Sequence, residues 1–201
     1  MPGSILIELQ YLPPVASLLA MARSEVVYLE ACEHYSKGSW RNRCLIAAAN
    51  GTQLLSVPLR KGKHQQMPIR EVRIAYDEPW QARHWQAIQS AYGRAPFFEH
   101  FGPELAPLYQ KQFTTLWEWN LSLLTTLYSC FGLRPNWQLT ESWEKEPATG
   151  IRDLRNAIHP KKPLPEDLAE LPPYPQVFED KHGFLPNLCA LDLLMCQGRL
   201  L

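Results

Sequence analysis

The first thirty residues constrain the fold most, because two apolar runs there flank a short helical stretch. The run 5–9 (Ile-Leu-Ile-Glu-Leu) is rich in apolar and β-branched residues and predicts a buried strand. Helical spacing of Leu18, Leu19 and Ala22 predicts a helix over 15–23, and a second strand is predicted over 25–30. A strand, a short helix and a strand in that order form a βαβ unit, with parallel strands and a right-handed crossover.

Further strands precede a region of helical periodicity. The runs 44–49 and 53–59, joined by Asn-Gly-Thr at 50–52, predict a β-hairpin with a type I′ turn, and 69–74 is typical of one more strand. Helices are predicted over 79–93, 103–112, 113–131 and 188–196, the last with Asn187 as its cap. The expected fold class is α/β, with an N-terminal βαβ unit and a mixed sheet with a β-hairpin, followed by a mainly helical C-terminal half.

The chain is expected to form one domain over residues 1–201, because this length supports one substantial core and is too short for two full-sized ones. The segment 137–173 differs from the rest in being rich in proline and mixed in charge. We expect it to run over the surface as a long, partly ordered excursion.

Charge and cysteine usage exclude several classes of protein. Lys plus Arg and Asp plus Glu both number 20, so no net charge attracts nucleic acid, and no nucleic-acid partner is expected. No apolar run approaches the ~18–20 residues that span a bilayer. The 5 cysteines include no C-x-x-C pair, which argues against disulfides and structural zinc. Without a signal-peptide pattern at its start, the chain is expected in the cytoplasm, and no metal is expected.

The densest polar cluster runs from 30 to 43, where the second predicted strand ends. The carboxyl ends of strands are where α/β sheets place ligands. Arg41 and Arg43, which flank Asn42, have the geometry to hold a carboxylate or phosphate, and Glu33 is a candidate base. The alternative is a solvated loop in which Glu30 and Glu33 pair with these arginines.

His84 is the second candidate for chemistry. It shares the predicted inward face of its helix with Trp80, Ile88 and Tyr92. A histidine on an apolar stripe is more often a neutral core group that satisfies one donor and one acceptor. Its position after the strand region supports the alternative, a general acid or base.

Known phosphate and hydrolase motifs do not occur in the sequence. Lys61-Gly62-Lys63 is basic and contains a glycine, so a phosphate could bind there, but the order of a P-loop is missing. Neither G-x-G-x-x-G, H-E-x-x-H nor G-x-S-x-G occurs, so the sequence identifies no cofactor.

Several short elements together resemble the WbqC-like family. They are Tyr11-Leu12-Pro13-Pro14, Trp40-Arg41-Asn42-Arg43, His84-Trp85 with Tyr92-Gly93-Arg94 and Pro96-Phe97-Phe98, and Asn187-Leu188 with Asp192-Leu193-Leu194. The succession covers most of the chain except the Pro-rich segment. The resemblance implies a bacterial protein with a cytoplasmic step in making or modifying a sugar precursor for a surface polysaccharide of the O-antigen type. It supplies no catalytic residue. Where the family usually has Ser, this chain has Cys189.

The leading hypothesis is a transferase that acts on a sugar or nucleotide-sugar precursor and binds its anionic group through Arg41 and Arg43. The substrate is a small anion: a sugar phosphate, a nucleotide sugar, or an acyl or amino donor. The predicted catalytic residues are His84 and Glu33. The predicted substrate-binding residues are Gln10, Tyr11, His34, Tyr35, Trp40, Arg41, Asn42, Arg43 and Tyr92. The alternatives are a non-catalytic adaptor of a polysaccharide-synthesis complex and a nucleotidyltransferase-like enzyme. The functional hypothesis requires Arg41, Arg43 and His84 to face one cavity.

Overall fold

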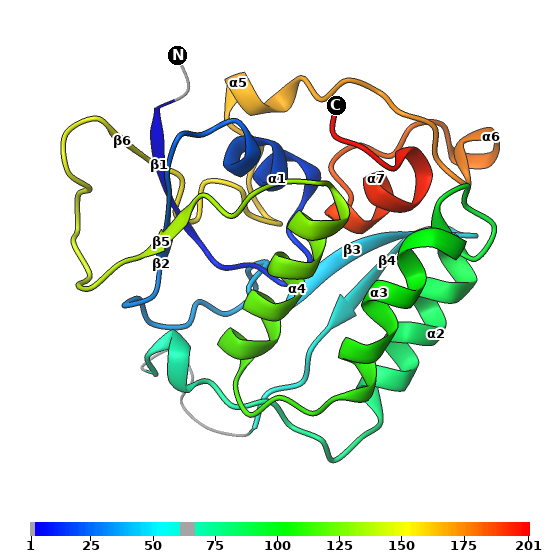
Figure 1. Cartoon of the computed structure of the whole chain (residues 1–201), viewed down its shortest axis with the longest axis horizontal. Coiled ribbons are helices and arrows are strands. Elements are labelled where there is room, and N and C mark those ends of the chain that lie inside the picture. Colours follow the sequence, from blue (N-terminus) through cyan, green and yellow to red (C-terminus); the bar gives the residue numbers. More distant parts are fainter. Residues whose placement is uncertain (1–2, 61–66) are drawn as a thin grey trace.

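A four-stranded parallel sheet forms one part of the molecule. The computed structural model describes residues 3–60 and 67–201; the basic segment 61–66, considered above for phosphate, lies outside them. The strands are β1 (Ser4–Glu8), β2 (Val27–Glu30), β5 (Trp137–Leu139) and β6 (Ile151–Asp153), in the order β5-β2-β1-β6. Helix α1 (Val15–Ala22) joins β1 to β2. The predicted α/β class and its N-terminal βαβ unit are confirmed (Figure 1).

The Pro-rich segment 137–173 supplies both edge strands of this sheet. Strand β5 pairs with β2, and β6 pairs with β1, each in parallel register. The segment also contains the short helix α5 (Glu166–Ala169). The expected partly ordered surface excursion thus includes two edge strands that were not predicted, because three-residue strands are too short to show an alternating pattern in the sequence.

A separate two-stranded sheet is the predicted hairpin, β3 (Arg43–Ala48) with β4 (Gly51–Ser56). Ala48 pairs with Gly51, so the turn lies at 49–50, earlier than predicted. Gly51 has a φ of 111°, whereas Asn50 does not have a positive φ. The turn is therefore not type I′, which needs positive φ at both central residues.

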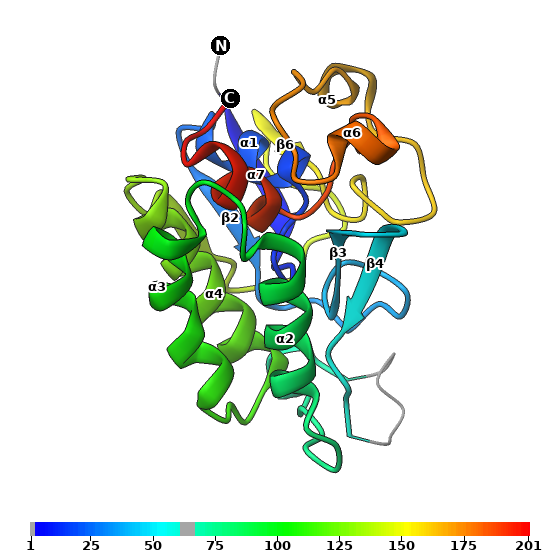
Figure 2. The same cartoon turned by 90° about the vertical axis from the view of Figure 1, so that its right-hand side faces the viewer.

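Helices cover the remaining core. The longer ones are α2 (Trp80–Tyr92), α3 (Phe98–Gln110), α4 (Leu116–Cys130) and α7 (Ala190–Gln197), and α6 is a short turn (Glu179–His182). Helix α2 lies between α3 and the hairpin (Figure 2). Helix α3 begins before its predicted start at residue 103. Helix α4 begins after its predicted start at residue 113, because Thr115 caps it in a capping box with Glu118. In the part of the chain that the structure describes, no helix has the length and apolar character to cross a membrane.

Two local predictions were wrong. The segment 69–74 forms a short 3-10 helix (Ile69–Glu71) followed by isolated bridges, because its backbone bonds go to separate segments. Asn187 does not cap α7, whose N-cap is Cys189. Instead, its Oδ1 accepts a hydrogen bond from the Ala16 amide, 3.0 Å away, at the start of α1. Asn187 therefore caps a helix that is distant in sequence.

Candidate functional site

The carboxyl ends of the parallel strands meet in a buried polar network, here called the carboxyl-edge cluster. It consists of Glu8, Gln10, Glu30, Glu33, Arg41, Arg155 and Asn156. Glu8 and Glu30 lie opposite each other on adjacent strands, and both are buried. Because neighbouring strands are only ~4.8 Å apart, these two carboxylates need hydrogen-bond donors and cations to remain charged.

The segment after β6 supplies donors to both carboxylates. Arg155 Nη1 lies 3.0 Å from Glu30 Oε2, and the Asn156 amide donates to Glu8 Oε2 at 2.8 Å. Thr140, just after β5, donates to Glu30 Oε1 at 2.7 Å. The two edge strands thus complete the network that β1 and β2 begin.

Arg41 is entirely buried and is held by protein groups. Its Nε donates to Glu33 Oε1 at 2.7 Å, its Nη2 pairs with Glu33 Oε2, and its Nη1 donates to Asn156 Oδ1 at 2.9 Å. Asn120 of α4 donates to the Arg41 carbonyl at 2.7 Å. The Arg41 guanidinium therefore pairs with Glu33 of its own chain. Pairing of Glu33 with an arginine of this loop was the alternative considered from the sequence.

Glu33 is equally committed to this ion pair, since both of its oxygens accept from Arg41. Burial raises the pKa of the Glu33 carboxyl to about 7, while the hydrogen bonds and charge of Arg41 oppose that rise. The neighbouring carboxylates Glu8 and Glu30 raise it further. Its predicted role as a base stays a prediction.

The other predicted binding residues near this cluster have structural partners. The Tyr35 hydroxyl donates to Asn42 Oδ1 at 2.8 Å, and Asn42 Nδ2 donates to the Val57 carbonyl at 2.9 Å. Trp40 packs in a small apolar group with Ala16 and Ile158. His34 is exposed and forms a β-bridge with Pro68. Gln10 donates to Glu8, and its Oε1 is buried without a partner among the described residues.

His84 lies in a different environment, on α2. Its Nδ1 is 2.9 Å from the Tyr11 hydroxyl, which is 3.2 Å from the Tyr109 hydroxyl. Burial lowers the pKa of His84 to about 4, partly offset by a hydrogen bond to the Ser56 carbonyl. The imidazole is therefore neutral at neutral pH, with one acceptor and one donor satisfied. Tyr92 is also buried, and its hydroxyl accepts from the Ala47 amide at 3.1 Å.

A cavity of about 390 Å³, here called the His84 cavity, opens beside this imidazole. Its polar lining comes from Ser56, Asp77, Glu78, Arg83 and His84, and its aromatic lining from Trp80. Neither Arg41 nor Arg43 lines it, so the three residues expected to share a cavity do not do so here. Arg43, however, pairs in register with Ser56, so its side chain leaves the hairpin on the face of Ser56.

Two donors lack acceptors within the described residues, one on a residue that lines the His84 cavity and one on the hairpin partner of the lining residue Ser56. The indole Nε1 of Trp80 and the Nε of Arg43 are both buried without a hydrogen-bond partner. Such groups cost roughly 1–3 kcal/mol each unless water or a ligand satisfies them. Sequence reasoning did not select Trp80, because an aromatic residue on an apolar helix face looks like core. It also missed Asp77, Arg155 and Asn156, which only the fold brings near these sites.

These features define an α/β protein with a parallel sheet, a separate hairpin, a sealed ionic cluster and a cavity of small-molecule size. The chain belongs to the WbqC-like protein family, which it matches over residues 10–159. The resemblance identified from the sequence is thereby confirmed, and the match includes much of the Pro-rich segment that had been left outside it.

One relative illustrates the extent of the similarity. The chain is 34% identical over 135 residues to "Uncharacterized protein Rv1507c" of Mycobacterium tuberculosis (strain ATCC 25618 / H37Rv). The alignment covers 66% of this chain and 56% of that relative, so this chain spans little more than half of the longer protein. No solved structure matches the chain.

Proposed function

We propose that this protein is a transferase that acts on an anionic sugar or nucleotide-sugar precursor in surface polysaccharide biosynthesis, with the His84 cavity as its reaction site. The observations that carry the proposal are an unsatisfied donor on a residue that lines this cavity, Trp80 Nε1, and a second unsatisfied donor, Arg43 Nε, whose residue pairs in register with the lining residue Ser56. Donors without acceptors favour an acceptor-rich ligand, such as a phosphate group.

The proposal moves the anion-binding role from Arg41 to Arg43. Arg41 is neutralised by Glu33, whereas Arg43 has no ion pair with any residue that the structure describes. With the anionic group on Arg43 and Trp80, the acceptor hydroxyl or amine would lie toward Asp77 and His84. As the new bond forms, the bond to the leaving group breaks, and the acceptor proton passes to the Asp77 carboxylate.

His84 is suited to positioning the acceptor, not to taking its proton, because both of its ring nitrogens already have partners. Its hydrogen bonds to Tyr11 and to the Ser56 carbonyl hold a neutral ring against the cavity. Asp77 is an exposed carboxylate in the same cavity and can receive the proton directly. The cytoplasm remains the expected compartment, because the proposed precursor substrates are made there.

The test is a thermal-shift titration of the full chain with glucose 1-phosphate, UDP-glucose, ATP and UTP. Stabilisation of about 2.7 kcal/mol at a hundredfold excess over Kd is the expected size of effect for a true ligand. Arg43→Gln and Trp80→Phe should each weaken binding, and Arg23→Gln, an exposed cation at the end of α1, should not. Stabilisation by ATP and UTP alone would favour the nucleotidyltransferase alternative. No stabilisation by any probe would refute the proposal.

The adaptor alternative has one observation in its favour. Leu139, the last residue of β5, and Trp143, just after it, are large apolar side chains with 39% and 54% of their surface exposed. An adaptor would use them to contact a partner in a synthesis complex. If all small-molecule probes fail and Leu139→Ser with Trp143→Ser abolishes binding to a co-purified partner, this alternative replaces the enzyme.

A further inference from the structure

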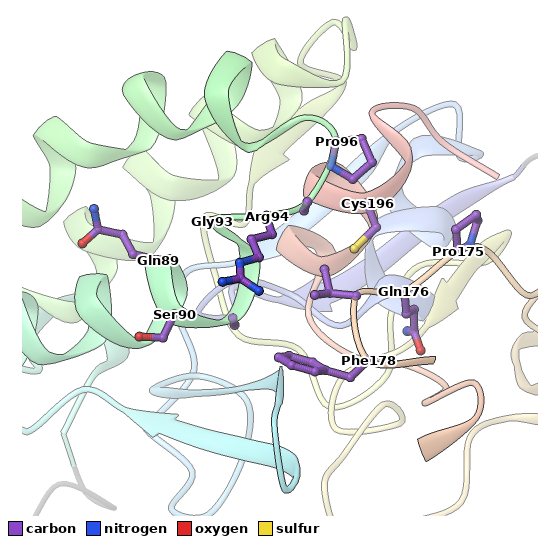
Figure 3. A pocket seen from close by; sticks show the side chains of 12 residues that line it. Gln89, Ser90, Gly93, Arg94, Pro96, Pro175, Gln176, Phe178 and Cys196 are labelled. Carbon is purple, nitrogen blue, oxygen red and sulfur yellow. The ribbon is translucent and has the colours of Figure 1, made fainter. Parts of the chain in front are cut away.

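The largest cavity described lies at the other end of α2 and is here called the Arg94 cavity. It has a volume of about 770 Å³ and lies between the end of α2, the stretch Arg94–Pro96, the stretch Pro175–Phe178 and the last turn of α7 (Figure 3). This volume falls within the ~300–1,000 Å³ of small-molecule sites. The Arg94 cavity is separate from the His84 cavity because the two share no lining residue and lie along different turns of α2.

Arg94 is the single charged residue among the 12 that line the cavity. Its guanidinium extends into the space between Ser90 and Phe178 (Figure 3). Arg94 is exposed and makes no ion pair with the residues at 3–60 and 67–201. A free guanidinium presents a planar fork of donors that matches a carboxylate or a phosphate.

The C-terminal ends of α2 and α7 near Arg94 favour a carboxylate over a phosphate as the anion that binds there. Gln89 and Ser90 belong to the last turn of α2, and Cys196 to the last turn of α7. Carbonyl groups at a helix C-terminus carry a negative partial charge. Those of Gln89 and Met195 already accept from the Gly93 and Phe97 amides, so the ligand would use the Ser90 and Cys196 carbonyls. One guanidinium can balance a carboxylate there, but a phosphate monoester, at about −1.5 to −2, would be left with uncompensated charge. The same carbonyls favour a ligand that is rich in hydroxyl donors.

An aromatic wall completes the cavity and is held rigidly. Phe178 turns its ring toward Arg94 (Figure 3), and the apolar C–H face of a sugar ring packs well on such a surface. The wall is anchored by Gln176, whose amide exchanges hydrogen bonds with Leu185 and donates to Asp192 Oδ2 at 2.9 Å. Tyr174 donates to the same Asp192 oxygen at 2.7 Å. Because the segment that carries Phe178 is already held in place before a ligand binds, less conformational entropy is lost on binding.

We propose that the Arg94 cavity binds a sugar acid, a polyhydroxylated ring with a single carboxylate, such as a hexuronic acid. The carboxylate pairs with Arg94, the hydroxyl groups donate to the carbonyls at the ends of α2 and α7, and the ring packs on Phe178. This site goes beyond the proposed reaction at the His84 cavity and does not depend on it.

Isothermal titration of the full chain at pH 7 and fixed salt tests the proposal, with D-glucuronate and D-galacturonate as probes and glucose, glucose 1-phosphate and glutamate as comparisons. At least one uronate should bind, and Arg94→Gln should weaken it on the order of tenfold. Phe178→Leu should weaken it severalfold. Arg134→Gln, an exposed cation outside the cavity, should leave it unchanged.

Each other outcome overturns the assignment in an identifiable way. Absence of uronate binding, or uronate binding that survives Arg94→Gln, removes the site. Equal binding of glucose shows that the carboxylate is not recognised, and stronger Arg94-dependent binding of glucose 1-phosphate shows that phosphate is preferred. Arg94-dependent binding of glutamate but not uronate replaces the sugar with an amino acid. None of these results bears on Arg43 or Trp80, so the proposed function is judged separately.

Discussion

Replacing Arg41 tests whether this guanidinium is a structural cation or a free anion-binding group. Arg41→Met keeps an apolar stem of similar length but leaves the Glu33 carboxylate buried without its counterion, and Asn156 Oδ1 without its donor. Breaking one partner of a buried pair costs about 3–5 kcal/mol. For a chain of this size each kcal/mol lowers Tm by about 2–4 °C, so the variant should melt ~6–20 °C lower.

Two matched variants make the result interpretable. Arg83→Gln breaks the exposed pair with Glu78 and should change stability by less than ~1 kcal/mol. The double variant Arg41→Met with Glu33→Leu removes both buried charges and should recover much of the loss, because no unpaired charge remains. Urea unfolding, followed by tryptophan fluorescence, gives all the free energies on one scale.

The outcome that would refute the reasoning is specific. If Arg41→Met costs less than ~1 kcal/mol, or if the double variant loses the sum of the two single losses, then Glu33 is not its essential partner. Arg41 would then be available to a ligand, as the sequence alone had predicted.

Two further predictions concern His84 and Asn187. The pKa of His84 is lowered from 6.5 to about 4, so its contribution to stability is present above pH 6.5 and lost as the pH falls towards 4. Between pH 7 and pH 4 the free energy of unfolding of the unmodified chain should fall by about 3 kcal/mol more than that of the His84→Asn variant. Titration of Glu33 affects both chains equally. Equal losses of stability would contradict the assignment to His84. Asn187→Gly keeps the positive φ of 54° accessible but leaves the buried Ala16 amide at the start of α1 without its acceptor, and should cost ~1 kcal/mol in urea unfolding. An unchanged midpoint would show that the cap contributes nothing.

Local patterns predicted those parts of the fold whose signal lies within one segment. The βαβ unit and the hairpin follow from apolar runs and turn residues that are adjacent in sequence. Strands β5 and β6 could not be found this way, because three residues carry no periodicity and become strands only by pairing with buried β1 and β2. Asn187 was recognised as a capping residue, but the helix it caps lies 171 residues away in sequence.

The sequence identified charged residues that take part in the polar cluster, but it did not show which residues they pair with. The sequence indicated that Arg41 holds a carboxylate, and it does, but the carboxylate is Glu33 of the same loop. Asn156, the second partner of the Arg41 side chain, is 115 residues away in sequence and enters only through β6. Arg43 and Arg41 were equivalent in the sequence because they flank Asn42. Only the fold separates the neutralised guanidinium from the one with an unsatisfied nitrogen.

Cations and donors without partners favour ligand binding away from the carboxyl edge of the sheet, where the unpartnered group is an acceptor, Gln10 Oε1. That edge is where an open α/β sheet ordinarily binds ligands, but here Arg41 and Arg155 already neutralise carboxylates of the chain itself. Trp80 Nε1, Arg43 Nε and the Arg94 guanidinium lack partners within the described residues, and Trp80 and Arg94 line different cavities along α2. Because the two cavities share no lining residue, we expect them to bind different molecules. Arg43→Gln should therefore leave uronate binding intact, and Arg94→Gln should leave sugar-phosphate binding intact. If one of these variants weakens the binding of both ligands, the two ligands share a single site.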